Sequence, residues 1–340
     1  MRLLNSNKKR RVTLQDVAKH SGVSRATASL VVRNSPSISE ATRDKVLISM
    51  RELGYVYDRI AANLRSQSSS TIGIIVTDVG NSFFSELLIG VHQELEKHGY
   101  TVLLGTTFDS ISKQEQLIST MLEHRVGGII LCPVSSSDKE TVERLKKLDT
   151  PYVIAVRELT GMNCDYAGID YNLGAQLAIK HLIQKGHKRI AFIGGRSESS
   201  TWKQRMEGYR TALQDGGLDV DESIIVPSAP TKDGGKEAIA KVLNLTLANR
   251  PTAIFCFSDL VAFGITVGLR NAGLTPGKDM DLVGFDNIPE SEILYPPLTT
   301  ISSFANLLGV EAAKLLHRRL IDSSVKQKKV IIKPELIVRG

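Results

Sequence analysis

The chain has 340 residues, of which 42% are hydrophobic, and this length is enough for two or three globular domains of ordinary size. The formal net charge of +7 is unevenly distributed, because residues 1–70 hold 13 of the 43 Lys and Arg residues but only 5 of the 36 Asp and Glu residues. The first 70 residues therefore carry +8 and the rest carry −1, which favours a phosphate-rich partner for the N-terminal part alone.

Three cysteines, Cys132, Cys164 and Cys256, stand far apart and form no CxxC or Cys/His cluster. The sequence therefore indicates neither a disulfide framework nor a metal site, and no motif calls for a cofactor. No apolar run approaches the ~20 residues that a membrane-spanning helix needs, and residues 1–11 lack the apolar centre of a signal peptide. We expect a cytoplasmic protein without a membrane partner.

Residues 13–34, TLQDVAKHSGVSRATASLVVRN, predict two short helices joined by a tight turn. Gly22 supplies a residue without a Cβ where the turn is sharpest, and Ser24 is placed to cap the second helix. The apolar positions that can pack the two helices together are Leu14, Val17, Ala18, Val23, Ala28, Val31 and Val32.

The opposite face of the second helix carries Arg25, Ala26, Ser29 and, near its edge, Leu30. A helix-turn-helix places such a face in the major groove of DNA, and the positive charge of residues 1–70 fits that partner. The alternative is a small helical hairpin without a special purpose. The basic arm at 1–12, with KKRR at Lys8–Arg11, is either a segment that follows the DNA backbone or a solubilising leader.

A third helix is predicted after Ser39, which can cap it, and Gly54 supplies its end, so residues 13–57 form a headpiece. Residues 58–70 then combine a helical segment of about two turns, DRIAANLR, with the polar linker SQSSS. So short a helix is marginal alone in water. We expect it to form by pairing with a second copy on DNA, which makes it a candidate order–disorder switch.

From Thr71 onward, continuous apolar segments alternate with helical stretches, a pattern typical of parallel sheets covered on both faces. We predict an α/β core at 71–340 with two lobes, approximately 71–170 and 171–300, and a C-terminal segment that crosses between them. Ligands of such sheets bind beyond the carboxyl ends of the strands. The polar loops at 78–84, 196–205, 258–259 and 286–287 therefore predict a cleft between the lobes that suits a sugar or a similar polar ring. The predicted strands are 72–76, 101–105, 127–131, 152–156, 189–195, 253–257 and 282–286.

An ordered set of motifs runs along most of the chain. It comprises TLQDVAKHSGVSRATAS from Thr13, ELGY, RIAANLR, HLIQKGHKRIAFIGG at 181–195, PTAIFCFSDLVAFG at 251–264, LVGFDN at 282–287 and PPLTTI at 296–301. Together these motifs resemble the lactose-repressor/galactose-repressor family of bacterial transcription factors from Thr13 to Gly340. The resemblance implies a helix-turn-helix headpiece, a hinge helix and a periplasmic-binding-protein-like core of two Rossmann-like lobes. It also implies a homodimer or tetramer on palindromic operator DNA, controlled by a small molecule in the cleft.

The resemblance assigns DNA contacts to single residues of the second helix. Arg25, Ala26 and Leu30 occupy base-reading positions, and the guanidinium of Arg25 suits O6 and N7 of guanine. Many relatives have a polar residue in place of Leu30, which leaves open whether it touches a thymine methyl group or only packs. The neighbouring positions Ser24, Thr27 and Ser29 contact phosphate or pack the helix.

In the predicted hinge helix, Leu64 matches a leucine that wedges into the minor groove at a central CpG step and kinks the duplex. The alternative is a contact between the two hinge helices of a dimer, and both roles can hold at once. Tyr57 and Asp58 depart from the Pro-Asn pair often seen there, which leaves the start of the helix open. The DNA-contacting set of the hinge is Ala62, Asn63, Leu64 and Arg65.

For the effector, the resemblance points to the loops between the lobes. Arg205 and Asp286 suit opposite edges of one polar ring, such as a sugar, with an aromatic ring below it. The alternatives are that Asp286 caps a helix, Phe84 is core and Trp202 fills a gap. Pro230 stands near the position where several relatives place an aromatic ring. The predicted effector-binding residues are Asn81, Ser82, Phe83, Phe84, Arg157, Thr201, Trp202, Arg205, Ser258, Asp259 and Asp286.

The leading interpretation is a cytoplasmic, nucleoid-associated repressor of sugar or related catabolic genes, whose effector alters the hinge helices and so the affinity for DNA. A corepressor-type or activating regulator remains an alternative, and a sugar-binding protein without a DNA role is a remote one. The sequence holds no GxxxxGK[ST], GxGxxG after a strand, nucleophile elbow or HExxH, which argues against an enzyme. Because no leucine-heptad tail follows the last strand, we expect a homodimer.

Overall fold

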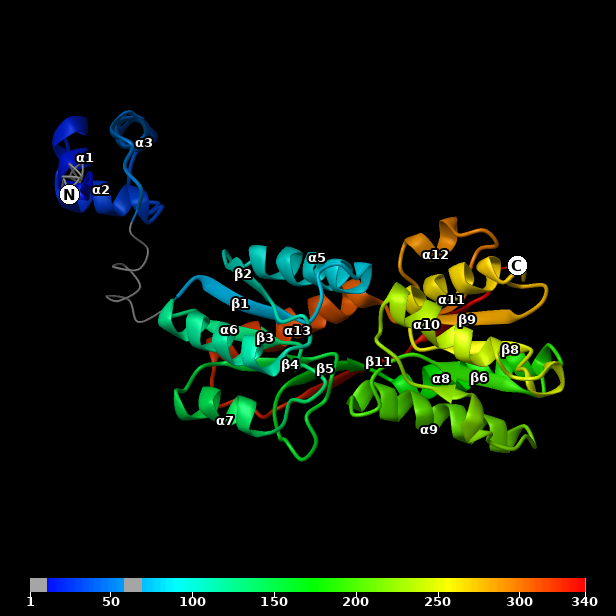
Figure 1. The fold of residues 1–340 in the computed structure, drawn as a ribbon. Coiled ribbons are helices and arrows are strands. Elements are labelled where there is room, and N and C mark those ends of the chain that lie inside the picture. The colour runs from blue at the N-terminus through cyan, green and yellow to red at the C-terminus, as the bar shows by residue number, and fades with distance from the viewer. Residues whose placement is uncertain (1–10, 58–68, 340) are drawn as a thin grey trace, which may run out of the picture. The chain divides into compact units, whose positions relative to one another are not determined.

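The computed structural model describes residues 11–57 and 69–339 of the chain. Its contacts divide the chain into two compact units, Met1–Ser68 and Ser69–Gly340, which are described separately here (Figure 1). The predicted hinge helix at 58–65 and most of the basic arm lie outside the described residues. The expectations for those two segments therefore stay predictions.

The headpiece holds three helices, α1 (Leu14–Ser21), α2 (Arg25–Val32) and α3 (Glu40–Leu53). Thr13 and Asp16 form a reciprocal capping box at the start of α1, and Gly22 ends this helix in the left-handed conformation, with φ of 69°. The hydroxyl of Ser24 accepts a hydrogen bond from the Thr27 amide at 3.0 Å. The predicted turn glycine and the predicted cap of α2 are thus confirmed.

The core of the headpiece is small and comes from all three helices. Val17 and Ala18 of α1, Ala28 and Val31 of α2 and Val46 of α3 are buried together. Val32 is only partly buried. Ser39 precedes α3 as predicted, but its side chain makes no cap to the backbone and donates to the Thr42 hydroxyl at 3.0 Å instead.

Lobe 1 of the core is built on a six-stranded parallel sheet. Its strand order is β11 (Lys329–Ile332), β5 (Tyr166–Ile169), β4 (Tyr152–Ala155), β3 (Gly128–Leu131), β1 (Thr71–Val76) and β2 (Thr101–Thr106). One face, with Ile74 and Ile130, packs under α5 (Ser82–Glu96) and α13 (Ala305–Ile321). The other face, with Ile75 and Leu131, packs under α6 (Ile111–Glu123) and α7 (Glu140–Lys147). Burial on both faces explains the continuous apolar strands of the sequence.

Lobe 2 has a second six-stranded sheet, in which all neighbouring strands are parallel except the edge strand β12, which pairs antiparallel with β10. Its order is β12 (Glu335–Ile337), β10 (Thr299–Ser302), β9 (Asp281–Asp286), β8 (Ala253–Cys256), β6 (Ile190–Ile193) and β7 (Ile225–Val226). Two packed helix pairs cover opposite faces of this sheet (Figure 1). The pairs are α8 (Tyr171–Gln184) with α9 (Ser200–Asp215) and α10 (Lys232–Leu243) with α11 (Asp259–Asn271). The remaining short elements are α12 (Glu290–Ile293), η1 (Glu222–Ile224) and η2 (Leu247–Asn249).

Within residues 69–339 the chain passes between the lobes three times: after β5, after β10 and between β11 and β12. Helix α13 therefore belongs to lobe 1 although the strand before it belongs to lobe 2 (Figure 1). The helices α5 and α13 touch through their backbones. A Cβ added to Gly90 would lie 2.0 Å from the carbonyl oxygen of Asn306, and one added to Gly309 would lie 2.1 Å from that of Leu87. Only glycine allows this approach.

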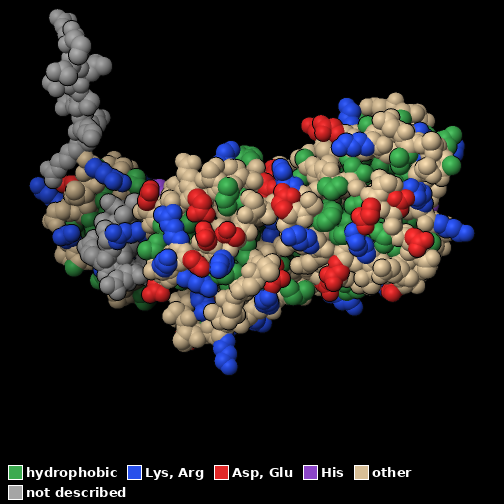
Figure 2. Space-filling view, turned by 60° about the horizontal axis from the view of Figure 1, so that its bottom comes forward, with side chains coloured by type: hydrophobic (Ala, Val, Ile, Leu, Met, Phe, Trp, Pro, Cys, Tyr) green, Lys and Arg blue, Asp and Glu red, His purple; other side chains and the backbone are tan. Residues whose placement is uncertain are grey.

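The predicted fold class is confirmed: a helix-turn-helix unit precedes a two-lobed α/β core. Each of the seven strands named from the sequence is present within one or two residues of its predicted bounds. The strands that were not named are β5, β7, β10, β11 and β12, which have two to four residues each. No helix in the described ranges combines the length and apolar character needed to span a membrane. Lys and Arg side chains are interspersed with Asp and Glu on the core face that Figure 2 shows.

Candidate functional site

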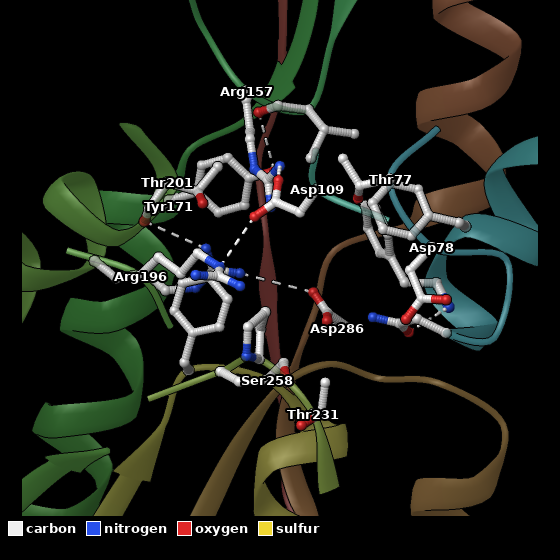
Figure 3. Close-up of a pocket in the computed structure, with 18 of the residues that line it drawn as sticks. Thr77, Asp78, Asp109, Arg157, Tyr171, Arg196, Thr201, Thr231, Ser258 and Asp286 are labelled. Atoms are coloured by element: carbon white, nitrogen blue, oxygen red, sulfur yellow. Dashed lines mark hydrogen bonds and ion pairs between the residues drawn. The ribbon is translucent and has the colours of Figure 1, made fainter. Parts of the chain in front are cut away.

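A cavity of about 260 Å³ lies between the two lobes of the core (Figure 3). Its lining residues follow the carboxyl ends of β1, β2, β4 and β5 in lobe 1 and lie at or after those of β6, β7, β8 and β9 in lobe 2. This is the edge where parallel α/β sheets bind their ligands, because the loops gather there. The two sheets thus present their loops to one shared space.

Arg205, on α9, is the most enclosed cation of the cavity, since only 3% of its surface is exposed. Its guanidinium carbon lies 3.9 Å from the ring centroid of Phe285 and 4.4 Å from those of Tyr171 and Phe257. Nη1 donates to the carbonyl of Thr201 at 3.3 Å, while Nε has no hydrogen-bond partner among the described residues. The aromatic rings therefore hold the cation in place but leave a donor free.

Asp286, at the end of β9, faces this guanidinium. Its Oδ1 lies 3.7 Å from Nη2 of Arg205, which is an ion pair but too long for a hydrogen bond. Burial raises the pKa of the Asp286 carboxyl well above its usual value, and the charge of Arg205 opposes that rise. The backbone of Asp286 has φ of 116°, a strained conformation for a non-glycine residue. Both charged groups thus have unused hydrogen-bonding capacity, which a ligand rich in hydroxyl groups can fill.

A second cluster of charged side chains, Asp109, Arg157 and Arg196, connects the two lobes across the cavity. Asp109 of lobe 1 accepts a hydrogen bond from Arg157 Nη1 at 2.7 Å, and its Oδ2 lies 3.1 Å from Arg196 Nε of lobe 2 (Figure 3). The backbone amide and hydroxyl of Ser135 also donate to Asp109, at 2.9 and 2.8 Å, and Arg157 donates to the carbonyl of Pro133. One fixed carboxylate therefore joins two arginines and connects the lobes.

Aromatic rings form the apolar part of the lining. Phe83 and Phe84 meet edge to face, with 5.1 Å between their centroids. The hydroxyl of Tyr171 donates to the carbonyl of Val156 at 3.3 Å, so the ring is fixed beside Arg205. Apolar walls with a few oriented polar groups are typical of sites for small polar rings.

Eight of the predicted effector residues line this cavity: Asn81, Phe83, Phe84, Arg157, Thr201, Arg205, Ser258 and Asp286. Two other predicted effector residues, Ser82 of α5 and Trp202 of α9, do not line the cavity. The hydroxyl of Ser82 donates to Glu290 at 2.5 Å, which is a contact between the lobes beside the cavity. The indole of Trp202 donates to the carbonyl of Gly194 at 3.1 Å and stacks on Phe192, so it fills lobe 2, as the alternative interpretation had it.

Asp259 does not line the cavity either, because it is completely buried behind it. Its carboxylate accepts hydrogen bonds from the Ile288 amide at 2.9 Å, from the Ser291 hydroxyl at 2.7 Å and from the Thr300 hydroxyl at 2.5 Å. These contacts tie the turn after Asp286 to the neighbouring strand. Burial raises the pKa of Asp259 to about 6. The residue supports the turn rather than facing a ligand.

Several lining residues were not predicted. Asp109 and Phe108 follow β2, at positions that the rule of carboxyl strand ends could have identified. Arg196 and Asp78 lie in loops that this rule placed at the cleft, but neither residue was assigned a ligand contact. Tyr171 carries no such signal, because the strand before it was not recognised. The other lining residues outside the prediction are Thr77, Val156, Ala229, Pro230, Thr231 and Phe257.

The helix-turn-helix presents the predicted DNA-reading face on α2. Arg25 and Ala26 are exposed, while Ser29 and Leu30 are partly buried. The hydroxyls of Ser24 and Thr27 lie 2.9 Å apart, and Ser29 accepts a hydrogen bond from Arg33, so these three side chains stabilise the helix. The predicted hinge contacts Ala62, Asn63, Leu64 and Arg65 lie outside the described residues.

The described part of the chain holds no group of three or more His, Cys, Asp or Glu residues that could bind a metal ion. The cysteines Cys132, Cys164 and Cys256 are buried and unpaired. The chemistry of the cavity is therefore that of arginines, carboxylates, hydroxyls and aromatic rings.

Comparison with known families identifies the chain. Residues 69–338 match the model described as periplasmic binding proteins and sugar binding domain of LacI family. The chain belongs to the LacI family. Residues 13–58 match the model for bacterial regulatory proteins of the lacI family, which covers the helix-turn-helix. This LacI-family member is thus a DNA-binding transcriptional regulator with a ligand-binding core, and the resemblance drawn from its motifs is confirmed.

Curated relatives span nearly the whole chain. The catabolite control protein A of Priestia megaterium is 35% identical over 321 residues, which is 93% of this chain and 96% of the relative. The repressor PurR of Photobacterium profundum is 32% identical, with 96% and 97% covered, and the ribose operon repressor of Haemophilus influenzae is 31% identical, with the same coverage. These relatives are transcriptional regulators rather than enzymes.

Solved structures of LacI-family regulators are also similar to this chain. The transcriptional regulator CelR in complex with cellobiose aligns with a TM-score of 0.73 at 30% identity, covering 97% of this chain and 99% of that one. A LacI-family regulator from Enterococcus faecium with bound ribose has a TM-score of 0.72 at 30% identity, with 79% and 97% covered. The lac repressor dimer bound to operator has a TM-score of 0.83 at 24% identity, with 97% and 98% covered, which supports the shared fold.

Proposed function

We propose that this regulator binds a palindromic operator as a homodimer and that a small polar ring, a sugar or a sugar derivative, controls its affinity from the cavity between the lobes. The observation that carries the proposal is that Arg205 and Asp286 face each other, with 3.7 Å between Nη2 and Oδ1 and with both side chains nearly buried. Nε of Arg205 has no hydrogen-bond partner among the described residues. Ring hydroxyls can bridge such a pair. The printed ligands of two structural relatives, cellobiose and ribose, belong to this class.

The proposed base contacts of α2 are supported by the exposure and the chemistry of its side chains. Arg25 and Ala26 extend from the first turn of α2 into solvent, and Arg25 has no acidic partner among the described residues. A free guanidinium at this position suits a guanine edge, a contact worth about 1–3 kcal/mol of discrimination. We propose that Leu30 adds an apolar contact at the edge of the same face, and that Ala62 to Arg65, with Leu64 as the wedge, contact the minor groove at a central CpG step.

The proposed homodimer uses exposed apolar side chains of the core. In lobe 1, Leu104 on the edge strand β2 is 47% exposed and Ile89 on α5 is 44% exposed. In lobe 2, Val267 on α11 is 46% exposed, and Ile293 and Tyr295 beside α12 are 82% and 84% exposed. Figure 1 shows α5, α11 and α12 along one side of the core. The elements that carry these exposed apolar side chains thus share one side of the core, which suits a contact with a second copy.

Selection of operators from a random duplex pool tests the DNA part of the proposal. We expect enrichment of a palindrome with a central CG step, and no enrichment would refute it. With the selected duplex, Leu64→Ala should weaken specific binding far more than nonspecific binding. Sedimentation velocity should give a dimer, and a monomer on the selected operator would contradict the dimer contact.

A thermal-shift screen against sugars, sugar phosphates, nucleosides and purines tests the effector part. A ligand at about 100 times its Kd should add about 2.7 kcal/mol to the free energy of unfolding. Repeating operator binding with each hit shows whether the effector releases the DNA or acts as a corepressor. A hit whose binding survives substitution of both Arg205 and Asp286 would contradict the assigned site.

A further inference from the structure

Lobe 2 contains a second cavity of about 260 Å³ at the other end of its sheet. Its lining includes Asp281 and Leu282 at the start of β9 and Leu298 and Thr299 at the start of β10. The cavity between the lobes lies at the opposite, carboxyl ends of these strands, and the two cavities share no lining residue. The second cavity is therefore separate from the proposed effector site.

The interior of this second cavity is mainly apolar, with one unused polar group. Leu182 of α8, Val283 of β9 and Leu298 are nearly or fully buried in its wall. Thr266 of α11 also lines it and is only 1% exposed, yet its hydroxyl has no hydrogen-bond partner among the described residues. A threonine inside a helix usually bonds the carbonyl four residues before it, here that of Ala262. The free hydroxyl marks a place where a ligand atom can bind, because an unpartnered buried hydroxyl is costly.

The rim of the cavity is positively charged. Lys185, Lys278 and Arg339 line it, and the acidic residue among its lining, Asp281, is already paired. Asp281 Oδ2 lies 2.5 Å from Lys185 Nζ and 2.9 Å from His187 Nε2. Lys278 and Arg339 have no carboxylate partner in the described part of the chain, although Arg339 donates to the carbonyl of Leu298 at 3.1 Å. The surplus charge at the mouth favours an anion.

The geometry points to a second small-molecule site here, for a compact amphipathic anion whose apolar body enters the cavity and whose carboxylate stays at the cationic rim. The volume is sufficient, since an apolar protein cavity of about 150 Å³ holds benzene. Thr266 then donates to or accepts from the polar edge of the ligand, while Lys278 and Arg339 attract its charge. The inference does not depend on the proposed effector, because no residue is shared between the two cavities.

Binding of 4-fluorobenzoate to the full-length protein, followed by ¹⁹F NMR, tests this site, with 4-fluorobenzyl alcohol as the neutral comparator. We expect saturable binding of the acid with a Kd at or below about 1 mM and clearly weaker binding of the alcohol. Equal binding of the two probes would overturn the anion preference, and the absence of saturable binding by the acid would overturn the site.

Variants locate the bound probe. Lys278→Glu should weaken the binding of 4-fluorobenzoate about fivefold. The matched change Lys241→Glu, at an exposed lysine of α10 outside the cavity, should leave this binding unchanged. Thr266→Val should weaken it about two- to tenfold without lowering the melting temperature, because the hydroxyl it removes has no partner. Arg205→Met, in the other cavity, should have no effect. Binding that Arg205→Met abolishes and Lys278→Glu leaves unchanged would overturn the inference.

Discussion

Replacing Arg205 by methionine isolates the contribution of one buried charge to ligand binding. Methionine keeps most of the length and the apolar stem of arginine but removes the guanidinium. Three aromatic rings surround this group in the structure, at 3.9 to 4.4 Å from its central carbon. The rings can pack on the methionine sulfur instead, so the cage should stay filled.

The stability of the folded protein should change little. Each of the three ring contacts is worth about 0.5–2 kcal/mol, whereas burying the cation costs several kcal/mol, and these effects oppose each other. Removing one partner of a buried ion pair costs about 3–5 kcal/mol when the other charge is left unpaired. Because the Asp286 carboxyl, whose pKa is already raised, can take up a proton, we expect the free energy of unfolding of Arg205→Met to stay within about 2 kcal/mol of wild type. Asp286 should hold its proton more firmly in the variant, because the charge that opposes the rise of its pKa is gone.

Ligand affinity should change much more. Hydrogen bonds from a charged donor are worth about 1.5–3 kcal/mol, which corresponds to about 10- to 150-fold in Kd. Isothermal titration with the effector found by the thermal-shift screen gives this ratio directly. Operator affinity without effector, measured by fluorescence anisotropy, should match wild type, because the headpiece is unaltered.

Two controls make the result decisive. Arg210→Met changes an arginine of the same helix whose Nη2 pairs with Glu222 at 2.6 Å on the surface, and it should leave effector binding unchanged. Arg205→Lys keeps the charge but loses the planar fork, and it should fall between wild type and Arg205→Met. An effector Kd within twofold of wild type for a folded Arg205→Met protein would refute the role of Arg205.

Three further predictions concern other parts of the molecule. Because the folded state raises the pKa of Asp259 to about 6, it binds this proton more tightly than the unfolded chain. The free energy of unfolding should therefore fall by about 2 kcal/mol as the pH rises from about 4 to 6, and by about 3 kcal/mol over the full range from below the unfolded pKa to above the folded one. Urea titrations of Asp259→Asn should lack this slope. Gly90→Val should lower the free energy of unfolding by about 1–3 kcal/mol or more in urea, because its Cβ meets the carbonyl of Asn306, whereas Gln93→Ala on the exposed face of the same helix should have little effect. Arg25→Ala should relax base preference at one position of each half-site in a binding-selection assay, and equal weakening at all positions would mean that Arg25 contacts only phosphate.

The sequence was sufficient to predict those elements whose signals lie within a few neighbouring residues or recur along the chain. The turn glycine Gly22 and the cap Ser24 each follow from backbone chemistry, and the continuous apolar strands follow from burial on two faces. Strands such as β5 and β7 were not recognised. β7 has only two residues, and β5, YAGI, has fewer large apolar side chains than predicted strands of the same length such as β3, GIIL, and β6, IAFI, so hydrogen bonding to distant neighbours decides their conformation.

The predicted effector residues came from the family resemblance, and helical geometry explains which residues of α9 reach the cavity. Thr201 and Arg205 are four residues apart and share the face of α9 that lines the cavity. Trp202, one residue after Thr201, is rotated by about 100° and packs inside lobe 2 instead. The pairing of Asp109 with Arg196 joins loops 87 residues apart on different lobes, and no local pattern announces it.

The three passages between the lobes also set the order in which the protein can complete itself during synthesis. The first five strands of lobe 1 are synthesised by residue 169, but its helix α13 and its outer strand β11 are made only after all of lobe 2 except β12. At about 5–20 residues per second, the end of α13 at Ile321 follows the end of β5 by about 8–30 s. For that interval Leu87 and Val91 of α5, which α13 later covers, stay open to water. A nascent chain of this fold therefore has a defined period in which a chaperone can bind lobe 1, and the synthesis of α13 ends it.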